Sequence, residues 1–183
     1  MRNLILAAAL ATLPATGAFA ADKYTLDASH SQIVFSYDQL GFSTTYGMFS
    51  GFEGEIMFDE ANPAASSVNV SMPVKMMFTG WEKRDAHFMS ADFFDATDDE
   101  LVNFSSTSIE VTGDNTAKIT GDLTINGTTK SVVLDTTLNK AADHPRAQKP
   151  WLGFDATTTL LRSDFGVGAF APFVGDEVEV KIS

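Results

Sequence analysis

The fold class is indicated most clearly by residues 118–138, with the sequence K-I-T-G-D-L-T-I-N-G-T-T-K-S-V-V-L-D-T-T-L. Residues 118–125 alternate apolar and polar side chains, which is typical of a half-buried β-strand. Asn126-Gly127 follows, and this pair favours the two-residue type I′ turn, in which both residues need φ > 0. Residues 131–138 then repeat the alternation. The segment therefore predicts an antiparallel hairpin with one apolar and one polar face.

The same alternation occurs on both sides of this hairpin, interrupted by a loop with aromatic residues at 41–47 and by a polar loop at 139–150. Eight antiparallel strands that close on themselves form a barrel wide enough for side chains or one small ligand. We therefore expect a mainly β protein, an eight-stranded antiparallel barrel in a single domain over residues 21–183. The further strands are expected at residues 27–40, 48–59, 68–77, 101–111, 151–163 and 177–183.

One helix is expected between the third and fourth strands, over Thr79–Asp95. Thr79 and Glu82 fit a capping box, in which a hydroxyl and a carboxylate satisfy backbone N–H groups at the helix start. Apolar residues at helical spacing give this segment one broad apolar face. The helix is expected to cover one end of the barrel.

Residues 1–20 have the pattern of a secretory signal peptide. Arg2 is followed by an apolar core over Leu4–Leu13 and by the small-residue cleavage signal Ala18-Phe19-Ala20. We predict cleavage after Ala20 and export of residues 21–183. No later stretch has the roughly 20 apolar residues that a transmembrane helix needs.

The chain is acidic and has no cysteine. Its formal net charge is −12, and loss of Arg2 with the signal peptide changes this to −13. Such a surface repels phosphate backbones and anionic membranes, so nucleic-acid binding is not expected. Thiol nucleophiles and Cys-based metal sites are excluded. The three histidines lack the spacing of metal ligands, and we expect no metal site.

The chain contains 15 Phe and 7 Met, residue types that suit an adaptable lining for a chain-like ligand. The alternative is that these side chains simply fill the barrel, and the residues alone favour filling. Inward positions are inferred from the alternation and from the expected helix. The candidate ligand contacts are Ile33, Phe35, Tyr37, Phe42, Phe49, Phe52, Ile56, Val70, Met72, Val74, Met76, Trp81, Phe88, Phe93 and Phe94.

Five motifs occur in order along the chain. They are Y-T-L-D-A-S-H-S-Q-I-V-F (24–35), G-M-F-S-G-F-E-G-E-I-M-F-D (47–59), R-D-A-H-F-M-S-A-D-F-F-D (84–95), G-D-L-T-I-N-G-T-T-K (121–130) and R-S-D-F-G (162–166). Together they resemble the YceI family. That resemblance implies a lipocalin-like antiparallel barrel in the bacterial periplasm. It also implies a long apolar cavity that in some members holds a polyisoprenoid, an isoprenoid quinone or another amphiphile.

The resemblance favours a non-enzymatic carrier that binds an isoprenoid lipid or quinone and has no covalent cofactor. Arg84, Asp85 and His87 are predicted either to meet the ligand head group or to clasp the helix to the barrel. Two alternatives remain: an enzyme acting on such a ligand with His87 and Asp85 as acid and base, and a structural or stress protein whose barrel is self-filled. Exposed aromatics such as Phe42 and Tyr46 could support a homodimer.

Overall fold

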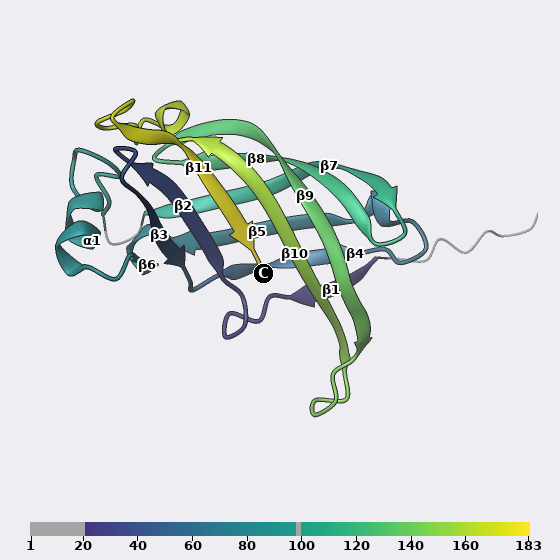
Figure 1. Ribbon diagram of the computed structural model, residues 1–183. Coiled ribbons are helices and arrows are strands. Elements are labelled where there is room, and N and C mark those ends of the chain that lie inside the picture. The colour runs from purple at the N-terminus through teal and green to yellow at the C-terminus, as the bar shows by residue number, and fades with distance from the viewer. Residues whose placement is uncertain (1–20, 98–99) are drawn as a thin grey trace, which may run out of the picture.

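The computed structural model describes residues 21–97 and 100–183, so the predicted signal peptide lies outside the described residues. Eleven antiparallel strands form one sheet in the order β1-β4-β5-β7-β8-β9-β10-β11-β2-β3-β6. The sheet curls into a half-barrel with the short helix α1 at one end (Figure 1). The elements are β1 (Asp22–Thr25), β2 (Ile33–Gln39), β3 (Ser43–Phe49), β4 (Glu53–Phe58), β5 (Ser67–Pro73), β6 (Met77–Phe78), α1 (Glu82–Phe88), β7 (Leu101–Gly113), β8 (Thr116–Ile125), β9 (Thr128–Asp143), β10 (Pro150–Leu161) and β11 (Val174–Ile182), with 3-10 turns at Pro63–Ala65, Val74–Met76 and Arg162–Phe165.

The mainly β, antiparallel architecture is confirmed, whereas the strand number and the closed barrel are wrong. Within the described residues, β1 pairs with β4 alone and β6 with β3 alone, so the sheet keeps two edges. These edge strands contain four and two residues. Such short edges leave few backbone groups unpaired.

The hairpin predicted at Asn126-Gly127 is confirmed. β8 and β9 pair from Ile125↔Thr128 onward, and Asn126 and Gly127 have φ values of 51° and 69°. Both residues thus adopt the positive φ that the type I′ turn requires.

Strand β3 replaces the loop predicted at residues 41–47. Its inner side is occupied by the ring of Phe35, which belongs to the neighbouring strand β2. A Cβ added at Gly47 would lie 2.2 Å from Phe35 Cζ. Gly47 therefore leaves room for a ring from the next strand, and β3 lacks the apolar alternation that would have revealed it.

Strand β5 ends at Pro73, four residues before the end of the predicted strand. A 3-10 turn over Val74–Met76 follows, and it changes which side chains face inward. Val74 is fully buried, whereas Met76 is 44% exposed. The inward placement of Met76, inferred by continuing the alternation, is wrong.

Helix α1 spans only the middle of the predicted Thr79–Asp95 helix. Trp81 is its N-cap and makes no side-chain capping bond, so the predicted capping box is wrong. At the other end, Ser90 Oγ donates to the carbonyl of His87 at 2.7 Å. A side chain that bonds nearby backbone in this way competes with helix continuation.

Strands β9 and β10 extend into the segment 139–150 that was predicted to be a loop. The two strands pair as far as Asp143↔Pro150, well beyond their last pairings with β8 and β11. The result is a two-stranded ribbon that projects from the barrel (Figure 1). We call residues 139–154 the β9–β10 ribbon.

Candidate functional site

The concave side of the half-barrel encloses a cavity of about 1820 Å³. This volume exceeds the roughly 300–1,000 Å³ of sites that hold drug-sized ligands. All the longer strands contribute lining side chains, and most of these are aliphatic or aromatic. The half-barrel is therefore hollow over much of its length.

The cavity wall is tightly packed beside α1 and more open further along the sheet. The core contains Phe35 and Tyr37 of β2 and Phe49 of β3, each less than a tenth exposed. By contrast, inward residues such as Ile119 and Leu134 line the cavity and remain only half-buried. Because a side chain in a filled core loses nearly all its exposed area, these positions face open space.

A row of aromatic rings lines the α1 end of the cavity. The centroid of the Phe88 ring lies 6.4 Å from that of Tyr37 and 4.9 Å from that of Phe93. Phe93 in turn lies 6.0 Å from Phe170, in the segment before β11. The row joins the sheet, the helix and this segment into one aromatic wall.

A second group of rings comes from β1, β4 and β10. Phe58 lies 6.4 Å from Tyr24 and 6.3 Å from Phe154, both edge to face. Burial raises the pKa of Tyr24, and the carboxylates of Asp22 and Glu60 raise it further. Tyr24 therefore presents a neutral phenol to the cavity.

Most of the predicted ligand contacts line the cavity. Three do not: Phe42 is 90% exposed in the β2–β3 turn, Val74 is buried outside the cavity lining, and Met76 lies on the surface. Whether the others touch a ligand stays a prediction. The predicted residues that line the cavity are Ile33, Phe35, Tyr37, Phe49, Phe52, Ile56, Val70, Met72, Trp81, Phe88, Phe93 and Phe94.

Arg84 and Asp85 converge on Thr79 rather than on each other. Asp85 Oδ1 accepts hydrogen bonds from the backbone N–H and the hydroxyl of Thr79, at 2.9 and 2.5 Å. Arg84 donates from Nε to Thr79 Oγ1 at 2.9 Å and from Nη2 to Thr79 O at 3.0 Å. This arrangement fixes α1 to the chain that leaves β6, and it has the geometry of a clasp.

His87 lines the cavity, but Asp85 does not. The imidazole Nε2 of His87 lies 2.8 Å from Asp92 Oδ2, and its ring lies 5.1 Å from that of Phe93. Asp85 is occupied by Thr79. The two side chains therefore do not form an acid–base pair around a common point in the cavity.

Arg162 is a cavity-lining residue that sequence reasoning did not select as a site residue. Its guanidinium donates to four carbonyl oxygens, those of Gly175 (2.9 Å), Val167 (2.8 Å), Ala169 (3.3 Å) and Val174 (3.1 Å). Burial lowers its pKa, although the nearby carboxylate of Asp176 opposes this. Arg162 thus holds the segment that carries Phe170 against the barrel.

Within residues 21–97 and 100–183, no group of three or more His, Asp or Glu side chains is placed to hold a metal ion. Nor does any helix described there have the length and apolarity to cross a membrane.

A sequence profile of the YceI-like domain matches residues 24–183. The chain belongs to the YceI-like domain family. It is 38% identical over 186 residues to protein YceI of Shigella flexneri, covering 100% of this chain and 96% of that protein. The family resemblance inferred from five motifs is therefore confirmed.

Two solved structures have similar folds. BcnA of Burkholderia cenocepacia has a TM-score of 0.76 at 27% identity, and the match covers 85% of this YceI-like chain and 96% of BcnA. A polyisoprenoid binding domain from Saccharophagus degradans, implicated in plant cell wall breakdown, has a TM-score of 0.64 at 11% identity. That match covers 88% of this chain and 95% of the domain, and it shows the fold alone.

Proposed function

We propose that this YceI-like protein is a periplasmic carrier that holds an isoprenoid-like lipid or an isoprenoid quinone. The observation that carries the proposal is the cavity of about 1820 Å³ with its apolar and aromatic lining. A self-filled barrel would leave no such space, so the cavity supports a binding protein over a structural one. The polyisoprenoid-binding description of a protein with the same fold supports this ligand class.

An apolar tail accounts for binding without a charged contact. Burial of ~10 methylene groups contributes about 8 kcal/mol, at ~0.8 kcal/mol for each group. Association costs several kcal/mol in lost translational and rotational freedom. Tails longer than this therefore leave a clear net gain, and the two groups of aromatic rings in the lining add contacts.

The geometry supports binding rather than catalysis. An enzyme acting on the same ligand would need His87 and Asp85 near one reacting atom. His87 faces the cavity while Asp85 bonds Thr79. The same bonds support the clasp role for Arg84 and Asp85, whereas a head-group contact remains a prediction for Arg84 and His87.

Both tryptophans of the chain line the cavity. Trp81 is the N-cap of α1, and Trp151 lies on the ribbon. Ubiquinone should therefore quench the intrinsic fluorescence of delipidated protein and saturate at one equivalent. Val132 lines the cavity, whereas its neighbour Val133 is 43% exposed and does not. Val132→Phe and Val133→Phe make the same chemical change on opposite faces of β9.

We expect Val132→Phe to weaken quinone binding about tenfold. The larger ring would take up space that the bound quinone fills, and overpacking of a filled site costs about 1–3 kcal/mol. Val133→Phe should bind like the wild type. Equal affinities for both variants, or no saturable quenching by quinones or polyprenols, would refute the cavity as the binding site.

A further inference from the structure

The β9–β10 ribbon projects beyond the strands on either side of it. β9 last pairs with β8 at Thr137, and β10 first pairs with β11 at Ala156. Residues 139–143 extend the ribbon by about 17 Å, at ~3.4 Å for each residue. Two hydrogen bonds close the tip as a turn, in which His144 Nδ1 accepts the backbone N–H groups of Arg146 (3.3 Å) and Ala147 (3.1 Å).

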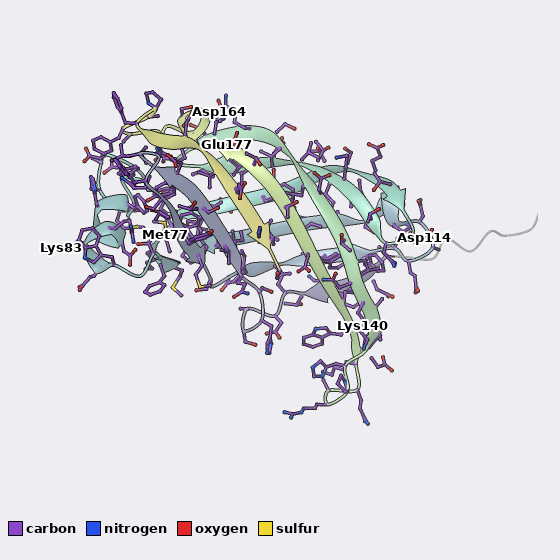
Figure 2. The ribbon with its side chains drawn as sticks, in the orientation of Figure 1. Met77, Lys83, Asp114, Lys140, Asp164 and Glu177 are labelled. Carbon is purple, nitrogen blue, oxygen red and sulfur yellow. The ribbon has the colours of Figure 1, made fainter. Side chains whose placement is uncertain are left out.

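The ribbon tip is basic on an acidic protein. Residues 140–149 contain Lys140, Arg146 and Lys149 against the single carboxylate Asp143, whereas the whole chain has a net charge of −12. Within the described residues, these three basic side chains have no ion-pair partner. Figure 2 shows Lys140 on the ribbon, far from Asp164 and Glu177, whereas Asp114 lies nearer to it.

An aromatic side chain accompanies the basic ones. The Trp151 ring lies 4.8 Å from that of His144 and is 40% exposed. The pairings Trp151↔Ala142 and Gly153↔Lys140 put Trp151 and Lys140 on the same face of the ribbon, because alternate residues of a strand share a face. Trp is the residue type enriched where apolar and aqueous phases meet.

The ribbon also forms part of the cavity wall. Residues 149–154, from Lys149 to Phe154, line the cavity. The basic and aromatic tip is therefore continuous with the apolar interior, and a surface bound by the tip would lie next to it.

We propose that the β9–β10 ribbon docks the protein onto an anionic phospholipid surface. The docking itself does not depend on the proposed function. The further step, in which a lipid enters or leaves the cavity at this point, rests on the proposed function. The net negative charge of the barrel does not prevent docking, because the Debye length at physiological ionic strength is about 8 Å, less than the reach of the ribbon. An acidic patch on a second copy of this chain is the competing occupant, and the lipid surface is favoured by the exposed indole beside the cavity.

The test is flotation of residues 21–183 with phosphatidylcholine vesicles, with and without phosphatidylglycerol. The ribbon variant is Lys140→Gln/Arg146→Gln/Lys149→Gln. The control, Lys118→Gln/Lys130→Gln/Lys181→Gln, has the same net charge and changes exposed lysines on the barrel. Each cation near an anionic surface contributes about fivefold to partitioning, so we expect about a 100-fold loss for the ribbon variant and little change for the control.

The wild type should float with the anionic vesicles and not with phosphatidylcholine alone, and binding should weaken as salt is raised. Absence of anionic-vesicle binding, or equal losses in both variants, would overturn the proposal. So would sedimentation showing that the ribbon variant dissociates a dimer while vesicle binding is unchanged. Quinone titration of the wild-type protein separates the two proposals: uptake without docking refutes the ribbon proposal alone, and docking without uptake refutes the carrier function alone.

Discussion

Replacing Arg162 with Met should remove much of the stability of the α1 end of the barrel. The guanidinium donates four hydrogen bonds to carbonyls of residues 167–175. Bonds from a charged donor contribute about 1.5–3 kcal/mol each, so the four together amount to at least about 6 kcal/mol. Removal of a partly buried charge and rehydration of some carbonyls return part of this free energy. We expect a net loss of about 3–5 kcal/mol, a large share of the roughly 5–15 kcal/mol of a typical domain.

The assay is urea unfolding followed by far-UV circular dichroism. For a urea m-value of about 2 kcal/mol per molar, the midpoint should fall by about 2 M. Arg162→Lys should be intermediate, because an ammonium lacks the planar fork that reaches several carbonyls at once. Arg146→Met is the matched control on the exposed ribbon tip and should change stability by less than about 0.5 kcal/mol. A loss below about 1 kcal/mol for Arg162→Met would refute the bracing role.

Three further predictions concern packing, acid stability and the clasp. Gly47→Ala should lower the free energy of unfolding by about 1–3 kcal/mol, because the added Cβ would meet the Phe35 ring. In urea unfolding, the double variant Gly47→Ala/Phe35→Leu should recover part of this loss. No recovery would contradict the steric cause. Hydrogen bonds from Ser29 and then His30 hold the pKa of Asp27 at about 2, so its contribution to stability is complete above the ordinary value of 3.8 and is lost as pH falls through about 2. Asp27→Asn should remove the dependence of unfolding free energy on pH between about pH 2 and 3.8, and leave the dependence at higher pH unchanged. Thr79→Val should lower stability by about 1–3 kcal/mol with quinone affinity unchanged, whereas weaker binding at full stability would favour a head-group role for Arg84.

The part of the fold that could be predicted from sequence is the part with independent local signals. The β8–β9 hairpin combines alternation with a turn pair that needs positive φ, and both signals agree with the structure. β3 has no such signal, because Gly47 contributes only the space that Phe35 fills. The outer part of the ribbon was missed because residues 139–143 of β9 are all exposed, and a strand without a buried face has no apolar alternation.

The cavity lining could be predicted where a strand stays regular. Ile33, Phe35 and Tyr37 on β2 follow the inferred phase and line the cavity. The phase fails at Met76, where a 3-10 turn follows Pro73. Arg162 could have been found only from the number of backbone carbonyls around it, which depends on the path of residues 166–175 and leaves no local pattern in the sequence.

Native mass spectrometry of protein isolated without detergent, followed by solvent extraction, tests the carrier proposal most directly. We expect one co-purifying isoprenoid lipid, quinone or similar long-chain amphiphile for each chain, and its loss or reduction in Val132→Phe but not in Val133→Phe. A ligand-free protein that also takes up neither quinones nor polyprenols when they are offered would contradict it, and the cavity of about 1820 Å³ would then need another occupant.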